Sequence, residues 1–311
     1  MTQLPDCRTM RLGLALATLV LAAPARLAAQ PRPQSNPAPG PDNAFVVSTD
    51  WLAAHAADRD LVLIHVVQDS AYAGEQIPGS RRVWYRSFVL ANGTVSTELP
   101  PVNALRETLE KAGISNTSRV VVYASDAPMA TRLLFTLDYL GHDRMAFLDG
   151  GLRKWKRENR PVTSGVVAPA PTRYTASPRE ALVVNADWLT DRLDRPGLSL
   201  IDTRTPQEFS GTGASGGLPS TGHLAGARLL AWESMFSDEE HSVLRPRAEL
   251  EQLFADIVRP GDQVVTYCWV GYRGSATYFI ARHLGYDVRL YDGSFQDWSQ
   301  RKLPVRAGST P

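Results

Sequence analysis

The chain contains very little cysteine: 2 of its 311 residues, Cys7 and Cys268, carry a thiol. Cys7 lies in an N-terminal segment that we expect to be removed, so the mature protein would keep one thiol and could form no intramolecular disulfide. Histidine is scarce too, and the 6 histidines lack the paired spacing of zinc sites. We therefore predict neither a metal nor a cofactor.

An excess of charge of one sign is missing as well. The 33 lysines and arginines nearly balance the 32 aspartates and glutamates, and the formal net charge is +1. The basic residues form no stripe with interleaved aromatic side chains, so nucleic acid is not the expected partner. The composition does not indicate an oligomeric state.

A long apolar run occurs near the N-terminus. Arg8 and Arg11 precede the stretch Leu12–Ala23, and small residues follow it. This order predicts a secretory signal peptide over residues 1–29, because the apolar core is too short for a comfortable transmembrane helix. The alternative is an uncleaved anchor or a frayed N-terminus.

Cleavage near Ala25 or Ala29 would release a periplasmic or secreted protein with no membrane span in its mature form. Residues 30–43 are rich in proline and predict an extended spacer. At 311 residues, the chain is long enough for two domains to follow this spacer.

The rest of the sequence contains an internal repeat with a shift of 137 to 144 residues. The matched segments are Asp50–Leu52 with Asp187–Leu189, Val121–Ala124 with Val265–Cys268, and Leu140–Asp143 with Leu284–Asp287. An ordered series of matches predicts two homologous domains, at residues 44–160 and 182–306, joined by a linker at 161–181.

Short β-branched runs alternate with helical patterns in each repeat. In the second repeat we expect strands near 183–184, 198–202, 226–230, 263–267 and 288–291, and helices near 187–193, 247–257 and 275–284. The alternation predicts an α/β fold in which each domain is a mainly parallel sheet flanked by helices. Ligands of such sheets bind beyond the carboxyl ends of the strands, and Cys268 follows a strand there.

The segment around Cys268 favours a reactive thiol. A β-branched strand leads into a turn with Gly271 and then into a helix, which places the thiol near unpaired helix N–H groups that favour an anion. The thiolate is the nucleophilic form. A small residue buried at the end of a core strand is the alternative.

Four motifs in order resemble the tandem-domain rhodanese family of thiosulfate and 3-mercaptopyruvate sulfurtransferases, in its exported bacterial form. They are Asp202-Thr203-Arg204, Gly222–Ala227, the loop Cys268–Arg273, and Tyr291–Ser294 with Trp298. In that family an inactive first domain commonly precedes a catalytic second one. Here Ala124 stands where the second repeat has Cys268, so the resemblance implies an inactive domain at 44–160 and a catalytic one at 182–306.

The resemblance implies transfer of the outer sulfur of thiosulfate, through a persulfide on Cys268, to cyanide or a thiol. The expected partners are therefore a small anionic sulfur donor and one of these acceptors. Besides the catalytic Cys268, the implied substrate-binding residues are Arg204, Trp269, Val270, Gly271, Tyr272 and Arg273, with Asp202 and His223 as structural support.

Two of these assignments have a structural alternative. Arg204 either contacts the anionic donor or forms an ion pair with Asp202 or Glu208. Arg273 either offers positive charge to a sulfur oxyanion or ties the loop to nearby carbonyl groups.

The substrate prediction is limited by two departures from the family pattern. Trp269 and Val270 match neither the basic residue often found in thiosulfate enzymes nor the small residues of 3-mercaptopyruvate enzymes, so a 3-mercaptopyruvate sulfurtransferase is the alternative. Residues 211–221 are an insertion relative to the first repeat, either a mobile wall of the pocket or an ordinary surface loop.

Two other classes share part of this pattern. A phosphatase loop has five residues between its cysteine and arginine, whereas 4 lie between Cys268 and Arg273, and this tighter ring favours sulfur over a phosphoryl group. A non-enzymatic persulfide carrier or binding protein would share every motif and stays open.

Overall fold

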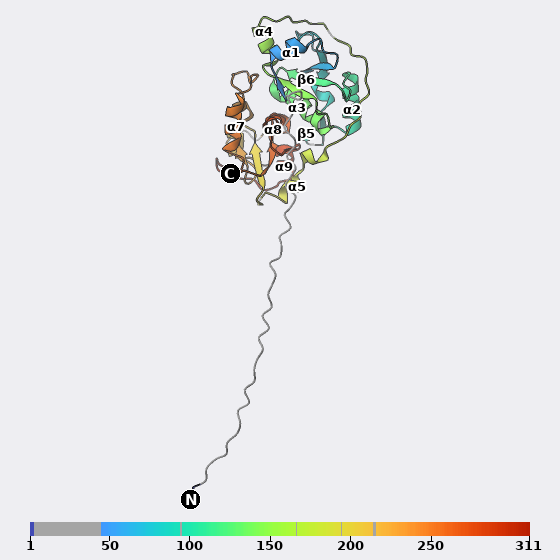
Figure 1. The fold of residues 1–311 in the computed structure, drawn as a ribbon. Helices are drawn as coiled ribbons and strands as arrows, with labels where there is room; N and C mark the ends of the chain where they lie inside the picture. Colours follow the sequence, from blue (N-terminus) through green and yellow to red (C-terminus); the bar gives the residue numbers. More distant parts are fainter. Residues whose placement is uncertain (3–44, 94, 166, 194, 214–215) are drawn as a thin grey trace. The chain divides into compact units, whose positions relative to one another are not determined.

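The structure, a computed structural model, describes residues 1–2 and 45–311 except 94, 166, 194 and 214–215. The predicted cleavage sites and the proline-rich spacer lie outside the described residues. From residue 45 onward the chain forms two α/β halves with the same topology (Figure 1).

The first half contains five parallel strands in the order β1-β7-β6-β2-β3. These strands are β1 (Val46–Val47), β2 (Leu61–Val67), β3 (Arg81–Trp84), β6 (Arg119–Ala124) and β7 (Met145–Leu148). Its helices are α1 (Thr49–His55), η2 (Tyr85–Ser87), α2 (Val102–Lys111), α3 (Ala127–Tyr139) and α4 (Gly151–Arg157). A small antiparallel hairpin joins β4 (Leu90–Asn92) to β5 (Val95–Glu98).

The second half repeats this arrangement with the strand order β10-β9-β11-β12-β8, again all parallel. Its strands are β8 (Val183–Val184), β9 (Leu198–Asp202), β10 (Arg228–Leu229), β11 (Gln263–Tyr267) and β12 (Val288–Tyr291). Its helices are η3 (Glu180–Leu182), α5 (Ala186–Thr190), α6 (Pro206–Ser210), η4 (Trp232–Met235), α7 (Arg247–Ala255), α8 (Tyr272–Leu284) and α9 (Ser294–Gln300). The predicted fold class is confirmed.

The helices differ from the sequence expectation where local contacts decide their ends. Helix α8 begins at Tyr272, earlier than expected, because Gly271 precedes it with a φ of 81°. Helix α6 was not predicted, since its five residues are too few for a periodic pattern. Thr205 and Glu208 hold it by hydrogen-bonding to each other's backbone amide.

The boundary between the halves is formed by two helices that occupy equivalent places in the repeat. Helix α3 is buried along its whole length, because it packs between the sheet of its own half and helix α8 of the other half (Figure 1). A helix that is apolar nearly all round is typical of such a central position. The core therefore continues from one half into the other, with Phe135 and Tyr278 in edge-to-face contact at 4.8 Å.

A buried carboxylate lies between these helices. Asp138 of α3 accepts hydrogen bonds from Tyr278 Oη at 2.8 Å and from Arg282 Nε at 2.9 Å, both on α8. Arg179, just before η3, donates to it at 2.5 Å. Because buried charges are costly unless paired, this cluster specifies how α3 and α8 fit together.

None of the helices in the described part of the chain is long and apolar enough to span a bilayer.

We expect Asp138→Asn to lower the free energy of unfolding by about 3 kcal/mol, because buried Arg282 and partly exposed Arg179 lose their compensating charge. Urea unfolding followed by circular dichroism measures the loss. Asp60→Asn is the matched control, since Asp60 also binds two arginines but at an exposed position. Equal losses for the two variants would contradict the role given to Asp138.

Candidate active site

Cys268 lies directly after β11, at the carboxyl edge of the second sheet. Its backbone N–H donates to Ser294 Oγ at 3.2 Å, and its carbonyl accepts from Phe295 N at 3.0 Å. Both partners belong to the first turn of α9, so α9 as well as β11 holds Cys268 in place. The side chain is fully buried, and the thiol is closed off from solvent in this structure.

The loop from Cys268 to α8 is shaped by Gly271. Its φ of 81° favours glycine, and an added Cβ would lie 2.7 Å from the carbonyl oxygen of Asp292. Among the described residues, no acceptor is found for the amides of Trp269, Val270 and Gly271. Unpaired amides beside a helix N-terminus can hold an anion, which is what a thiolate or persulfide requires.

Arg273, in the first turn of α8, forms a two-pronged ion pair with Glu208 of α6, with both N–O distances 2.8 Å. Burial alone would raise the pKa of Glu208, but the hydrogen bonds from Arg273 and from Thr205 lower it to about 2. Burial lowers the pKa of Arg273, yet Glu208 and the negative charge of Cys268 raise it above its ordinary value. The side chain therefore ties the loop to a carboxylate rather than to carbonyl groups, and lies within electrostatic range of the sulfur.

Arg204 forms an ion pair with Asp202, which is the structural alternative that the sequence left open. Its Nε and Nη2 donate to the carboxylate of Asp202, the shortest distance being 2.6 Å, and Nη2 also donates to the carbonyl of Gly222 at 2.7 Å. Its guanidinium lies 3.9 Å from the ring centre of Phe295, and the residue is fully buried. In this structure Arg204 supports the strand end, and contact with a donor would require a change in these bonds.

Asp202 and His223 have the geometry expected of structural residues. Asp202 orients Arg204 and also accepts a hydrogen bond from Tyr267 Oη at 2.7 Å. His223 stacks on Phe209 with ring centres 3.8 Å apart, and its ring nitrogens lie 2.9 Å from Phe209 O and 3.1 Å from Thr310 O. These contacts fasten the turn before β10 and the end of the chain.

The insertion at 211–221, except for residues 214–215, is described and packs near the loop. A Cβ added at Gly216 would lie 2.7 Å from the indole of Trp269. Leu218 and Trp269 pack against the same cluster of buried apolar side chains in the second half. The amide of Ser220 donates to Ser299 Oγ of α9 at 2.9 Å. The insertion thus covers Trp269, as a wall of the site would.

The first half contributes residues that the sequence interpretation missed. Tyr272 Oη donates to the carboxylate of Asp126 at 2.5 and 2.7 Å, and Thr97 Oγ1 donates to the carbonyl of Val270. Arg132 of α3 donates to Asp292 Oδ1 at 2.6 Å. In each of the three contacts, a residue of the half without a thiol binds a residue on or beside the Cys268 loop.

The signal in the sequence that could have found Arg132 is the comparison with its repeat equivalent, Ala276, which carries no charge.

The equivalent position in the first half carries no nucleophile. Ala124 ends β6 where Cys268 follows β11, and His65 stands where the second half has Asp202. The ring of His65 stacks on Tyr123 at 4.6 Å, and burial together with nearby Arg82 lowers its pKa to about 4. His65 is therefore a neutral imidazole that packs against Tyr123 and has no thiol next to it.

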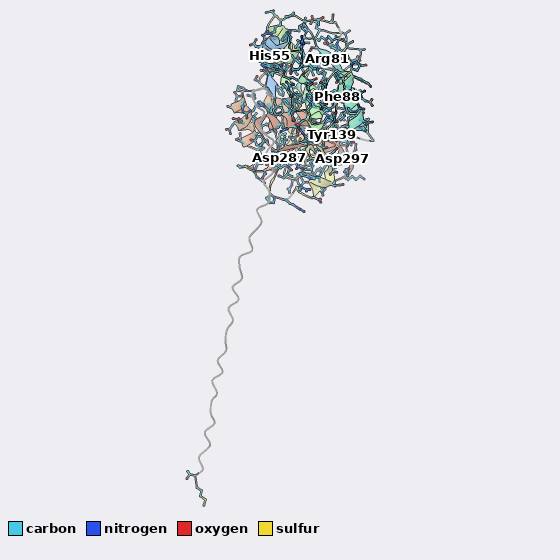
Figure 2. All side chains as sticks on the ribbon, turned by 45° about the vertical axis from the view of Figure 1, so that its right-hand side comes forward. His55, Arg81, Phe88, Tyr139, Asp287 and Asp297 are labelled. Atoms are coloured by element: carbon cyan, nitrogen blue, oxygen red, sulfur yellow. The ribbon has the colours of Figure 1, made fainter. Side chains whose placement is uncertain are left out.

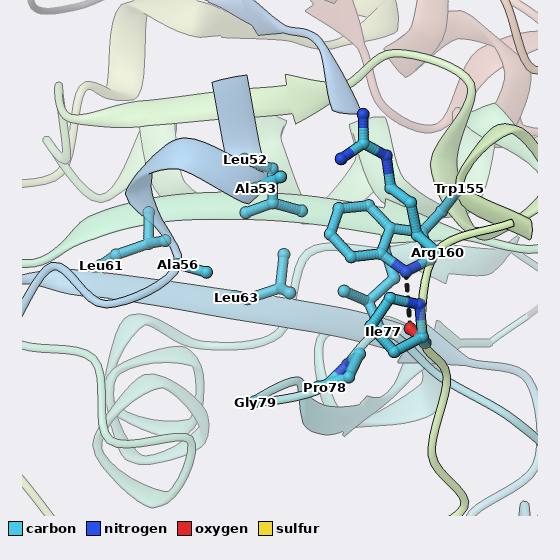
Figure 3. A pocket seen from close by; sticks show the side chains of 11 residues that line it. Leu52, Ala53, Ala56, Leu61, Leu63, Ile77, Pro78, Gly79, Trp155 and Arg160 are labelled. Atoms are coloured by element: carbon cyan, nitrogen blue, oxygen red, sulfur yellow. Dashed lines mark hydrogen bonds between the residues drawn. The ribbon is translucent and has the colours of Figure 1, made fainter. Parts of the chain in front are cut away.

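A groove of about 530 Å³ lies between the halves beside Asp292. Tyr139 and Asp297, which are both labelled in Figure 2, line this groove. A second cavity, of about 300 Å³, lies in the first half among apolar side chains such as Leu63 and Ile77, where Trp155 Nε1 donates to Pro161 O at 2.7 Å (Figure 3). This second cavity contains none of the residues predicted for catalysis or binding.

We expect Glu208→Gln to lower the free energy of unfolding at pH 7 by about 2 kcal/mol, after allowance for solvent screening of this partly exposed pair. Because the folded-state pKa of Glu208 is depressed from 4.5 to about 2, its contribution is complete above pH 4.5 and is lost as the pH falls towards 2. Urea unfolding between about pH 6 and pH 3.5 should therefore show the difference between variant and wild type narrowing.

The control is Glu249→Gln, which removes an exposed carboxylate paired with Arg245 on one face of α7. It should change stability little at any of these pH values. A gap between Glu208→Gln and wild type that stays constant with pH would disagree with the ion-pair geometry.

Comparison with known proteins identifies the fold and the relatives of this chain. The rhodanese-like domain family matches residues 48–158 and 185–301. The thiosulfate sulfurtransferase of Corynebacterium glutamicum is 32% identical over 281 residues, which cover 85% of this chain and 90% of the relative. The sulfur carrier protein TtuD of Thermus thermophilus is 28% identical over 283 residues, covering 85% of this chain and 96% of the relative.

Among solved structures, the anaerobic ergothioneine biosynthesis enzyme from Chlorobium limicola, in complex with trimethyl histidine, has a TM-score of 0.75 at 21% identity. The match covers 87% of this chain and 72% of that one, and it shows a common fold. Together with the family match to both halves, these findings establish that the chain belongs to the rhodanese family, as a sulfurtransferase built from two tandem rhodanese domains.

Proposed function

We propose that this sulfurtransferase uses thiosulfate as its donor and carries the transferred sulfur as a persulfide on Cys268. The observation that carries the proposal is the buried thiol of a loop that turns at Gly271. The Trp269, Val270 and Gly271 amides of this loop have no acceptor among the described residues. The corresponding loop of the first domain has neither the thiol nor the glycine. The C. glutamicum relative named thiosulfate sulfurtransferase supports the choice of donor.

The chemistry follows from a thiolate in this position. The Cys268 sulfur attacks the outer sulfur of thiosulfate, a new S–S bond forms, and the old S–S bond breaks with its electron pair leaving on sulfite. Cyanide then attacks the terminal persulfide sulfur, and thiocyanate leaves while the Cys268 thiolate returns. A thiol acceptor would give a new persulfide in the same way.

The loop would stabilise both anionic states. The Trp269, Val270 and Gly271 amides and the N-terminal end of α8 supply partial positive charge where the thiolate and persulfide carry negative charge. Since the thiol is closed off from solvent, a donor reaches it only when one of the surrounding walls moves. Trp269 under the insertion and Val270 under the β4–β5 hairpin are the loop positions closest to such walls.

A persulfide carrier is the second candidate. The T. thermophilus relative is named a sulfur carrier protein, and full burial of Cys268 suits a persulfide that must be protected until a partner arrives. A carrier and an enzyme form the same persulfide, so they differ in turnover with small acceptors. Use of 3-mercaptopyruvate in place of thiosulfate is the other alternative.

We further propose that the protein is exported through the signal peptide at residues 1–29 and acts in the periplasm or outside the cell. The support is the order of Arg8, Arg11 and the apolar stretch that follows them.

Incubation with thiosulfate should add one sulfur, about 32 Da, to Cys268, because the persulfide remains on the enzyme until an acceptor removes it. Intact-mass spectrometry measures the shift, and peptide mapping locates it. Cys268→Ser should show no shift and release no sulfite, while its circular dichroism stays that of the wild type. An unmodified wild-type mass would sink the covalent mechanism.

A side-by-side assay with thiosulfate, 3-mercaptopyruvate and a phosphate ester decides the donor. Thiosulfate should give many turnovers with cyanide, faster than 3-mercaptopyruvate, and the phosphate ester none. Preference for 3-mercaptopyruvate would replace the donor proposed here. A single stoichiometric sulfite burst without turnover would instead favour the carrier.

Expression of the full chain in a Gram-negative host should place the protein in the periplasm, with a mature N-terminus just after Ala25 or Ala29. N-terminal sequencing of the fractionated protein measures this. Arg8→Glu combined with Arg11→Glu should reduce export by weakening the basic start of the signal. A protein that keeps residue 1 and stays in the cytoplasm would refute the export proposal.

A further inference from the structure

Arg132 is a buried cation that reaches the Cys268 loop from the first domain. Its side chain is fully buried, with Nη1 donating to Asp292 Oδ1 at 2.6 Å and Nη2 donating to the carbonyl of Thr97 at 2.7 Å. A Cβ added to Gly271 would lie 3.4 Å from Nη1, so the guanidinium lies against the loop itself. Among the described residues, its Nε–H has no acceptor.

Tyr85, in η2 of the same domain, is a second buried donor without a partner. Its ring meets Tyr272 of the loop edge-on, with ring centres 5.4 Å apart, and its hydroxyl has no acceptor among the described residues. Leaving a buried donor unpaired destabilises a folded protein. Two such donors beside one loop indicate a place for an acceptor that the described residues do not supply.

The thiol and both donors lie within electrostatic range of one another. Burial raises the pKa of Tyr85, the charge of Arg132 opposes this, and the charge of Cys268 adds to it. Burial would lower the pKa of Arg132, but Asp292 raises it and the charge of Cys268 contributes in the same direction. The charge of the sulfur therefore acts on both donors.

The repeat shows that this cation is present on one side only. Thr131 and Ser275, which are 144 positions apart, hydrogen-bond to each other at 3.3 Å across the boundary between α3 and α8. The next pair at the same shift is Arg132 and Ala276. The domain with the thiol thus receives an arginine from its neighbour, while the domain without a thiol receives a methyl group.

We propose that Arg132 and Tyr85 bind the oxyanion group of the sulfur donor, so that the first domain supplies the donor-positioning part of the site. This inference rests on the proposed function and names the residues that hold the donor. The Arg132 Nε–H and the Tyr85 hydroxyl donate to oxygens of the thiosulfate SO₃ group while Cys268 attacks its outer sulfur. The same donors hold the sulfite that leaves with the electron pair of the broken S–S bond.

The test is calorimetric titration of sulfite into Cys268→Ser protein, in which no sulfur transfer occurs. Sulfite should bind this protein, and adding Arg132→Met should weaken the binding at least about tenfold, a loss of about 1.4 kcal/mol. Arg132→Lys keeps a charge beside Asp292 but removes the Nε donor, and Tyr85→Phe keeps the ring. Each of these two should weaken binding at least about threefold.

Arg282→Met is the matched control. Arg282 is also a buried arginine of an interdomain ion pair, but it binds Asp138 away from the loop. The sulfite affinity of the Arg282→Met variant should equal that of the Cys268→Ser parent. This result would separate a role in donor binding from a role in holding the domains together. In the thiol-containing protein, the KM for thiosulfate should rise in the same order, with the KM for cyanide unchanged.

Sulfite that fails to bind the parent, or binds all variants alike, would overturn the inference. If Arg132→Met does not fold, Arg132→Lys and Tyr85→Phe decide the matter by themselves. The proposed function fails separately: a sulfite affinity that follows the expected order, in a wild-type protein that forms no persulfide from thiosulfate, would leave the anion site standing without the reaction.

Discussion

The carboxylate of Asp292 joins the two domains and the Cys268 loop at a single point. It accepts the backbone N–H of Leu99 at 2.8 Å and Nη1 of Arg132 at 2.6 Å, both from the first domain. Its backbone and side chain also lie so close to Gly271 that a side chain there would collide with them. The repeat places Asp149 at the equivalent point of the first domain, where it accepts the N–H of Leu244 at 2.8 Å. Each domain thus binds the other through the residue after its fifth sheet strand, but only the Asp292 contact has an arginine and the Cys268 loop beside it among the described residues.

Charges around Cys268 are arranged as ion pairs that set positions more than they add stability. Arg204 is bound to Asp202, Arg273 to Glu208 and Arg132 to Asp292. Buried pairs of this kind regain roughly the cost of their own desolvation, so their main effect is geometric. They connect β9, α6 and α3 to the surroundings of the loop. Positive charge is thereby kept near the sulfur, and among the described residues the amides of Trp269, Val270 and Gly271 and two buried side-chain donors have no acceptor.

Several features could be predicted from the sequence because they depend on neighbouring residues. The apolar run that forms β9, the β-branched run that forms β11, the position of Cys268 after a strand, and the turn at Gly271 follow from local preferences. The repeat fixed the same strand order in both domains. Arg204 shows the limit of this reasoning. An arginine two residues after an aspartate can reach either the aspartate or a ligand, and the packing of Phe295 and the Gly222 carbonyl decided for the aspartate.

The sequence by itself determined that the chain has two related α/β domains and one thiol loop, since these are written in periodicity, repetition and a short motif. Only the tertiary structure decided what surrounds the thiol. Arg132 and Tyr85 lie more than one hundred residues from Cys268, in the domain that has no thiol. Arg132 reaches the loop because α3 packs against α8, and Tyr85 reaches it because its ring meets Tyr272 at the start of α8. Such packing depends on the fit of two whole surfaces, and no local pattern in either segment reports which side chain will face the other.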